Sequence, residues 1–182
     1  MKGLCGIDEA GRGALAGDLA ICGVMFKKNI KGLKDSKQIS PKKREVFYEQ
    51  IIKNSVYHKV FISAKDIDEL GLSKCFKIAL EEIMSKIPAK TFLFDGNTNY
   101  KVQNLECKIK ADESVAEVSA ASILAKVSRD ADMIKLSKIY PVYGFEKHKG
   151  YGTKAHIQAI KNHGLSKIHR KSFRLKALEF KI

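Results

Sequence analysis

Short segments of strand length, each bounded by turn-forming residues, constrain the fold of this chain more than any other feature. Segments of four to eight residues that are apolar or alternate apolar with polar positions are typical of β-strands. Five segments have this character: Leu4–Ile7, Leu19–Phe26, Val56–Ser63, Thr91–Phe94 and, more weakly, Cys107–Lys110. We therefore expect a central sheet of about five strands.

Longer segments with helical spacing lie between and after these strands. Ser40 and Pro41 supply a cap and a first-turn proline, and Ser114 and Glu117 have capping-box spacing before an alanine- and serine-rich segment. Four helices are predicted: Pro41 to about Lys53, Leu72–Lys86, a long helix opened by Ser114, and about Thr153 to Asn162. The mixture predicts an α/β fold with a central mixed sheet flanked by helices. Because the chain has no repeat or linker, residues 1–182 are expected to form a single domain.

Acidic residues stand at the ends of the expected strands. Asp8 and Glu9 follow the first strand, Asp95 ends the fourth, and Asp112 precedes the long helix. Chemistry in open α/β sheets gathers at strand ends, and four converging carboxylates would repel one another unless cations neutralised them. Oxygen ligands favour Mg²⁺ or Mn²⁺ over zinc. The pattern therefore predicts a site for one or two divalent cations.

The same acids have simpler structural explanations. Asp112 could be an ordinary acidic residue before a helix, and the Asp-Gly dipeptide at Asp95 could be only a turn. Neighbouring residues on a regular strand point to opposite faces, so Asp8 and Glu9 can share one site only if the strand ends or distorts between them. The glycine-rich sequence that follows makes such a distortion possible. This adjacent pair is the hardest to explain structurally.

A large excess of positive charge predicts an anionic partner. The 34 Lys and Arg residues against 20 Asp and Glu give a net charge of +14, which favours nucleic acid over a merely basic protein. Gly11-Arg12-Gly13 would let the backbone approach a sugar-phosphate chain, although such a sequence is often only a tight turn. Lys34–Lys37 and Lys147–Gly152 could contact phosphates or be solvated loops. Tyr151, between two glycines, could stack on a sugar or bond to a 2′-OH.

Cysteine and histidine spacing argues against a disulfide framework or a zinc site. Cys5, Cys22, Cys75 and Cys107 form no C-x-x-C pair, and three of them lie among apolar neighbours, as buried reduced thiols do. The five histidines show no H-E-x-x-H spacing. No signal peptide or membrane-length apolar run is present, so we expect a cytoplasmic protein without a membrane partner.

Six blocks of sequence occur in a characteristic order over almost the whole chain. They are G-I-D-E-A-G-R-G (Gly6–Gly13), L-K-D-S-K (Leu33–Lys37), F-D-G-N (Phe94–Asn97), V-S-A-A-S-I-L-A-K-V-S-R-D (Val118–Asp130), Y-G-F-E-K-H-K-G-Y-G-T (Tyr143–Thr153) and H-R-K-S-F (His169–Phe173). Together they resemble the blocks of ribonuclease HII, the type 2 ribonuclease H family. The chain departs from the family at Asp18, where proline is usual, and this extra acid could disturb metal affinity.

The resemblance implies a ribonuclease H-like fold. It also implies hydrolysis of RNA in RNA–DNA hybrids and incision 5′ of single ribonucleotides in duplex DNA. The family's roles fall on these residues: catalytic metal ligands Asp8, Glu9, Asp95 and Asp112, a 2′-OH-sensing turn Gly11, Arg12 and Gly13, a junction-reading Tyr151, and a phosphate contact Lys37. Two divalent ions, Mg²⁺ or Mn²⁺ and about 4 Å apart, would activate water and stabilise the leaving 3′ oxygen. Asp8 would bridge them, and the products would carry 5′-phosphate and 3′-hydroxyl ends.

Two other functions remain open from the residues themselves. A non-catalytic nucleic-acid-binding module would explain the positive charge without using the acids. A resolvase- or transposase-like nuclease would use similar acids to cut DNA alone. The terminal L-K-A-L-E-F-K-I contains no clear sliding-clamp-binding peptide, and we expect the protein to be a monomer.

Overall fold

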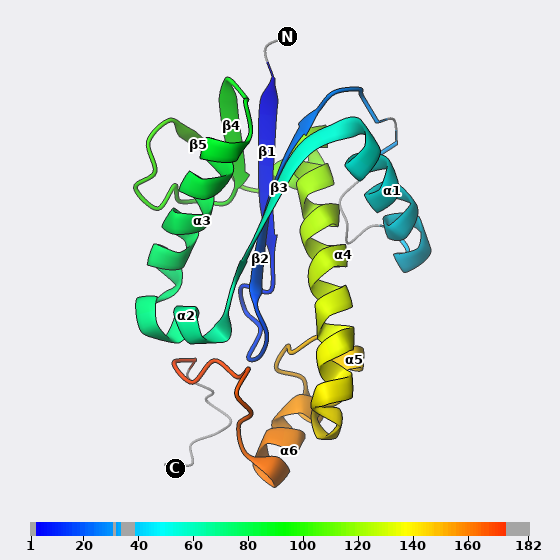
Figure 1. The fold of residues 1–182 in the computed structure, drawn as a ribbon, viewed down its shortest axis with the longest axis vertical. Coiled ribbons are helices and arrows are strands. Elements are labelled where there is room, and N and C mark those ends of the chain that lie inside the picture. Colours follow the sequence, from blue (N-terminus) through cyan, green and yellow to red (C-terminus); the bar gives the residue numbers. More distant parts are fainter. Residues whose placement is uncertain (1–2, 31, 34–38, 174–182) are drawn as a thin grey trace.

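The computed structural model describes residues 3–30, 32–33 and 39–173, and its centre is a five-stranded mixed sheet (Figure 1). The strand order is β3-β2-β1-β4-β5; β1, β2 and β3 pair antiparallel, whereas β4 pairs parallel with both β1 and β5. The strands are β1 (Leu4–Ala10), β2 (Leu19–Phe26), β3 (Ser55–Ile62), β4 (Thr91–Asp95) and β5 (Leu105–Lys108). The predicted α/β class and mixed sheet are confirmed.

The last strand was predicted two residues too late. It ends at Lys108, because Lys110 has a left-handed backbone with φ of 58° and leads into a short 3-10 helix. A left-handed residue cannot continue an extended strand. The first strand, in contrast, extends beyond its predicted end at Ile7 and includes both Asp8 and Glu9.

Helices cover both faces of the sheet. They are α1 (Pro41–Asn54), α2 (Ala64–Leu70), α3 (Leu72–Lys86), η2 (Ala111–Glu113), α4 (Ala116–Ile139), η3 (Pro141–Tyr143), α5 (Phe145–His148) and α6 (Lys154–His163). The predictions of α1, α3 and α6 are confirmed. The hydroxyls of Ser40 and Thr153 cap α1 and α6 by accepting hydrogen bonds from backbone N–H groups, as their sequences indicated.

The predicted capping box of the long helix is wrong. Helix α4 begins at Ala116 after an extended Val115, and no side chain caps it. The Ser114 hydroxyl instead donates to the Ala111 carbonyl at 3.5 Å and accepts from Lys108 Nζ at 2.9 Å. Ser114 therefore belongs to the short η2 turn, which places the acids that precede α4.

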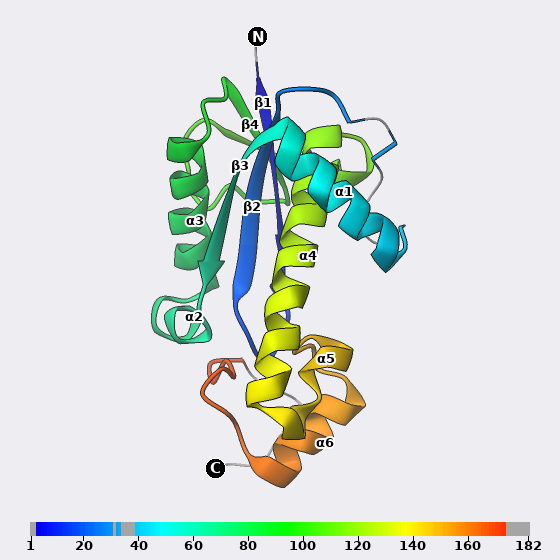
Figure 2. The ribbon, with the colours of Figure 1, turned by 45° about the vertical axis from the view of Figure 1, so that its right-hand side comes forward.

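Figure 2 shows helices on both sides of the sheet, and an apolar layer holds them on each side. On one face, residues such as Ile7 and Ile21 pack with Phe76 and Leu80 of α3. On the other face, small side chains of α4 pack with those of β1 and β2, including Ala10, Cys22, Ala120, Ala121 and Ala125. This small-residue layer lets α4 lie close to the sheet, as its composition predicted.

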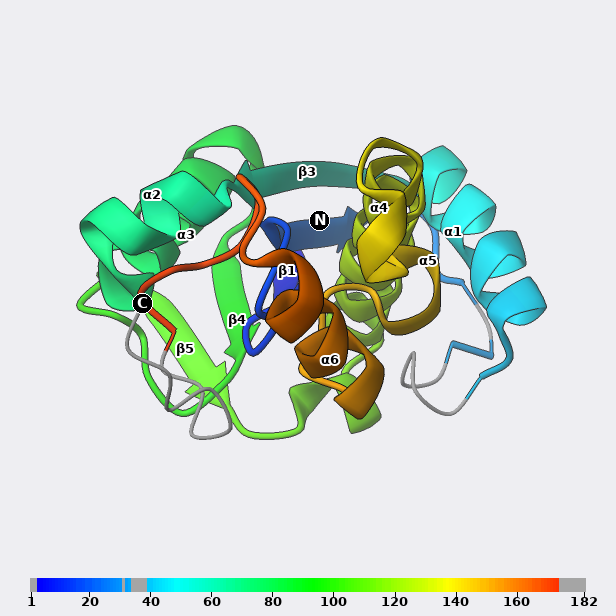
Figure 3. The same ribbon diagram turned by 90° about the horizontal axis from the view of Figure 1, so that it is seen from below.

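Helices α5 and α6 lie beyond one end of the sheet, nearest the viewer in Figure 3, and a third apolar cluster packs them against α4 and the loop that follows β1. It includes Leu15, Met133, Tyr143, Phe145 and Ile160. Residues 15–17 connect it to the sheet: Arg170 N donates to Leu15 O at 2.8 Å, and Leu15 N donates to Gly150 O at 2.8 Å. The segment around Arg170 and the loop around Gly150 are therefore both hydrogen-bonded to the loop between β1 and β2.

The cysteine prediction is confirmed within the described residues. Cys5, Cys22 and Cys75 are buried free thiols, and Cys107 is partly buried and also free. Burial raises the pKa of the Cys5 thiol to about 12, which keeps it protonated and unreactive. In the same part of the chain, no helix is both long and apolar enough to cross a membrane.

Candidate active site

Two aspartates lie side by side because β1 and β4 run parallel and in register. Ile7 pairs with Phe94, so the next residues along each strand, Asp8 and Asp95, are neighbours on the same face of the sheet. Parallel strands are only about 4.8 Å apart, so both carboxylates meet at the α4 face. The Asp8 side chain is also held locally, since its Oδ1 accepts a hydrogen bond of 2.7 Å from Glu9 N.

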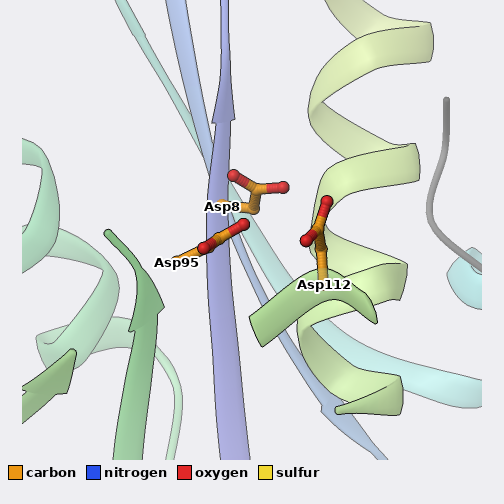
Figure 4. A group of neighbouring side chains, drawn as sticks. All are labelled: Asp8, Asp95 and Asp112. Atoms are coloured by element: carbon orange, nitrogen blue, oxygen red, sulfur yellow. The ribbon is translucent and has the colours of Figure 1, made fainter. Parts of the chain in front are cut away.

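The η2 turn brings Asp112 to the same place. Ala111 N donates to Asp95 Oδ1 at 3.2 Å, and the Ser119 hydroxyl of α4 donates to the Asp112 carbonyl. Carboxylate oxygens of Asp8, Asp95 and Asp112 all lie within 4.8 Å of one another. Figure 4 shows the three side chains converging from β1, β4 and the η2 turn. Three of the four predicted acids are therefore brought together.

The electrostatics of this cluster fit a bound cation. Asp8 and Asp112 are only 7% and 3% exposed. Burial, together with the nearby Glu9 and Asp95 carboxylates, raises the pKa of Asp8 well above its usual value. Buried carboxylates a few ångströms apart are stabilised as anions by a divalent ion with oxygen preference. The donor set therefore suits a metal such as Mg²⁺ or Mn²⁺.

Glu9 lies next to this cluster but not within it. Strand β1 stays regularly paired with β2 through Ala10, so the strand neither ends nor distorts between Asp8 and Glu9, which was the condition for their sharing one site. Glu9 Oε1 forms an ion pair of 2.8 Å with Arg12 Nε, and the Arg12 guanidinium stands 4.6 Å over the Phe76 ring. Burial raises the pKa of Glu9 although Arg12 opposes the shift, and its buried Oε2 has no hydrogen-bond partner among the described residues. The role of Glu9 as a metal ligand stays a prediction.

The Gly11-Arg12-Gly13 turn meets Tyr151 at the rim of the site. Gly11 N donates to the Tyr151 hydroxyl at 3.1 Å, although the two residues are 140 positions apart. Gly11 has a φ of +92°, and a side chain there would collide with Arg129. The turn is fixed from below by the buried Arg170, whose Nη1 donates to the carbonyls of Gly11 at 2.8 Å and Arg12 at 3.0 Å.

An open cleft of about 530 Å³ connects the acids with this turn. It is lined by Asp8, Glu9, Ala10, Gly11, Arg12, Gly13, Arg44, Asp95, Gly96, Ser122, Lys126 and Tyr151. The lining combines acids with cations and glycines, which suits a phosphodiester bound through its flanking phosphates. Asp112 approaches the cluster from η2 at the side.

Comparison with known protein sequences identifies the family of this chain. A family model described as Ribonuclease HII matches residues 5–176. The chain belongs to the ribonuclease HII family. Relatives named Ribonuclease HII from Sulfurovum sp. (strain NBC37-1) and Aliarcobacter butzleri (strain RM4018) are 55% and 57% identical over 178 and 180 residues. Each alignment covers 98% of this chain and 95% or 94% of the relative.

Solved structures of the family share the fold. The Archaeoglobus fulgidus RNase HII, determined in complex with PCNA, has a TM-score of 0.82 and 25% identity, covering 95% of this chain and 96% of its own. The ribonuclease H2 of Pyrococcus horikoshii OT3 has a TM-score of 0.76 and 27% identity, covering 94% and 93%. The ribonuclease H-like fold is confirmed. Family membership makes the protein a metal-dependent ribonuclease H hydrolase rather than a non-catalytic binding module.

Three side chains of the ribonuclease HII cleft that can bind phosphate or a carboxylate, those of Ser122, Lys126 and Arg44, were not predicted from the sequence. Ser122 and Lys126 are four residues apart on α4, so both face the cleft, and Ser122 also hydrogen-bonds to Asp8. Their spacing was a usable signal, because residues i and i+4 share a helix face. Arg44 enters the cleft from α1, and its lysine-rich neighbourhood offered no signal to single it out.

Two other sequence predictions have different outcomes. Lys37, the predicted phosphate contact, lies outside the described residues. Asp18 does not join the three clustered aspartates or the cleft lining. Its carboxylate instead interacts electrostatically with the buried guanidinium groups of Arg170 and Arg129, and its carbonyl accepts from Arg129 Nε at 2.8 Å.

Proposed function

We propose that this enzyme hydrolyses the RNA strand of RNA–DNA hybrids and incises duplex DNA on the 5′ side of single embedded ribonucleotides, as in ribonucleotide excision during DNA replication and repair. The observation that supports this most directly is the hydrogen bond between Gly11 N and the Tyr151 hydroxyl, beside the acidic cluster. A 2′-OH is a single donor and acceptor, so reading it requires a polar group held at close range. The turn and the tyrosine supply such groups next to the carboxylates.

The chemistry requires divalent cations, for which Asp8, Asp95 and Asp112 are the proposed ligands and Glu9 a further one. Two Mg²⁺ or Mn²⁺ ions held there would supply an activated water and stabilise the leaving 3′ oxygen. Asp8, whose pKa is raised by burial and by the neighbouring carboxylates, is the residue that we propose would be shared between the ions. Ser122 orients the Asp8 carboxylate from α4 through its hydrogen bond.

The chain's cations orient the substrate across this site. Arg12, Arg44 and Lys126 line the cleft around the acids, where they can pair with phosphates on either side of the cut. Lys126 Nζ also lies 5.9 Å from the Tyr151 ring centroid. It forms an ion pair of 2.9 Å with Asp130, and this pair orients the Lys126 side chain. We propose that the enzyme acts as a cytoplasmic monomer and without a clamp-binding peptide, although the terminal residues in question lie outside the described chain.

Cleavage mapping tests this function. Three end-labelled duplexes of one sequence would be compared: one with a single ribonucleotide, one with an all-RNA strand, and one of DNA only. With Mg²⁺ or Mn²⁺ we expect a cut 5′ of the ribonucleotide, multiple cuts in the RNA strand, and products with 5′-phosphate and 3′-hydroxyl ends. Cutting of the DNA-only duplex, or products with cyclic phosphate ends, would refute the proposal.

Substitution of Tyr151 tests how the ribonucleotide is read. Tyr151→Phe removes the acceptor of Gly11 N but keeps the ring, whereas Tyr151→Ala removes both. We expect incision at a single ribonucleotide to fall in both variants, less in Phe than in Ala, with a cost of about 1–3 kcal/mol for the complete loss. Cleavage of an all-RNA strand should change less, because adjacent 2′-OH groups provide other contacts. Wild-type rates and cut positions in both variants would show that Tyr151 is only a loop residue.

A further inference from the structure

We propose that His156 and His169 form a hydrogen-bonded relay that holds the backbone of Tyr151, and that both are positioning residues for the reading of a single ribonucleotide. The structural part of this inference depends only on the ring geometry. The functional part rests on the proposed function, in which Tyr151 contacts the substrate junction.

The hydrogen bonds of the relay allow only one arrangement of protons. Ser166 N, which can only donate, lies 2.9 Å from His169 Nδ1, and the Ser166 hydroxyl, 2.7 Å from the same nitrogen, can also donate to it. His169 Nδ1 therefore accepts, and the neutral ring carries its proton on Nε2. His169 Nε2 lies 3.0 Å from His156 Nε2, which must therefore accept. His156 then carries its proton on Nδ1 and donates it to the Tyr151 carbonyl, 3.0 Å away. Each ring nitrogen is satisfied only in this order.

The rings are buried, which keeps them neutral and their hydrogen bonds strong. His156 and His169 are 0% and 2% exposed, and burial lowers the pKa of both, that of His169 to about 4. The His148 ring stacks on His156 at 4.4 Å, and its Nδ1 accepts from Gly150 N at 3.3 Å. The Phe145 ring contacts both relay rings, with centroids at 5.4 and 5.8 Å. This aromatic packing restricts ring rotation.

The relay connects Tyr151, which lines the cleft, with a segment that supports the glycine turn of the cleft. One end lies in the 166–170 segment, which pairs with residues 15–17 and carries Arg170, the residue that binds the carbonyls of the Gly11-Arg12-Gly13 turn. The other end is the Tyr151 carbonyl, which also accepts from Thr153 N at 2.8 Å. Tyr151 is thus held at its carbonyl by His156 and at its hydroxyl by Gly11. Loss of the first bond would let Tyr151 turn away from the glycine turn.

NMR of the ring nitrogens in the full chain tests the relay without any substrate. Near neutral pH we expect Nδ1 of His156 to be protonated and its Nε2 unprotonated, with the reverse for His169. The Nδ1–H form is the less common one for neutral histidine in water, so its presence at His156 is a specific result. An Nε2–H form at His156, or a charged ring, would overturn the relay.

Two substitutions of His156 test its role in reading. Asn places its amide near Nδ1 and can still donate to Tyr151, whereas Gln places its amide near Nε2 and can bond only to His169. We expect the ratio of single-ribonucleotide incision to all-RNA cleavage to fall about tenfold in His156→Gln, as for the loss of one buried hydrogen bond, and to be largely retained in His156→Asn. His163→Gln, at an exposed ring, is the matched control.

The outcomes separate the relay from the proposed function. Equal losses in His156→Asn and His156→Gln, or an unchanged ratio in His156→Gln, would overturn the positioning role. If the unmodified enzyme does not incise single ribonucleotides, the proposed function fails, and the ring tautomers alone then decide whether His156 holds Tyr151. If a variant does not fold, the same NMR measurement on the unmodified chain still decides the relay.

Discussion

Asp8→Asn is expected to reduce hydrolysis of an RNA–DNA hybrid by about 1,000-fold or more, because several kcal/mol of transition-state stabilisation by cations would be lost. Asp8 adjoins Asp95 across the sheet, and its carboxylate lies within 4.8 Å of that of Asp112. It is also buried and hydrogen-bonds to Ser122. Asn preserves the shape of the side chain but removes the charge. Rates would be measured at saturating Mg²⁺ and, separately, at saturating Mn²⁺.

The fold and the hybrid affinity should survive this change. Burial of the charge and repulsion from the neighbouring carboxylates raise the pKa of Asp8, and both costs vanish when the side chain is neutral. Metal-free Asp8→Asn should therefore unfold at a temperature no lower than that of the unmodified protein. Phosphate contacts from Arg12, Arg44 and Lys126 remain. Asp132→Asn, which removes an exposed carboxylate paired with Lys135, is the control and should keep full activity. Near-normal turnover by a folded Asp8→Asn would disprove the assignment of the metal site.

Gly6→Ala is expected to destabilise the protein by about 3 kcal/mol or more, the upper range for overpacking a core. A Cβ atom at Gly6 would lie 2.3 Å from backbone atoms of both Glu117 and Val118, which form the first turn of α4. Backbone atoms cannot move aside as the end of a flexible side chain can, so α4 must shift away from β1. For a chain of this length, the unfolding temperature should fall by roughly 6–12 °C.

A matched glycine in the same motif provides the comparison. Gly13→Ala would meet no heavy atom within 4 Å, so its unfolding temperature should stay close to that of the unmodified protein. Because α4 carries Ser119, which holds the Asp112 backbone, Gly6→Ala should also weaken the response of the unfolding temperature to added Mg²⁺. Equal unfolding temperatures for Gly6→Ala and Gly13→Ala would show that α4 tolerates a wider spacing from the sheet.

Local patterns predicted the five strands, the four longest helices and all three clustered acids, Asp8, Asp95 and Asp112. The boundaries of Leu19–Phe26 and Leu72–Lys86 coincide with β2 and α3, because apolar periodicity within a segment reflects the face that the segment buries. Asp8 and Asp95 were identified because each follows an apolar segment that ends in a polar turn. The ordered sequence blocks resembled those of ribonuclease HII, and the match to the family model over residues 5–176 confirmed that family. These features depend on residues close to one another in the chain.

The tertiary structure alone decided how those residues meet. In-register parallel pairing of β1 with β4 makes Asp8 and Asp95 neighbours, and the hydrogen bond from Ala111 N to Asp95 brings in Asp112. The same regular strand leaves Glu9 outside the group of three aspartates, in an ion pair with Arg12. Contacts between residues more than 100 positions apart, such as Arg170 with Gly11 and Tyr151 with Gly11, leave no local periodicity. The sequence by itself therefore determined the elements and the chemical groups, whereas strand register and packing decided which groups share a site.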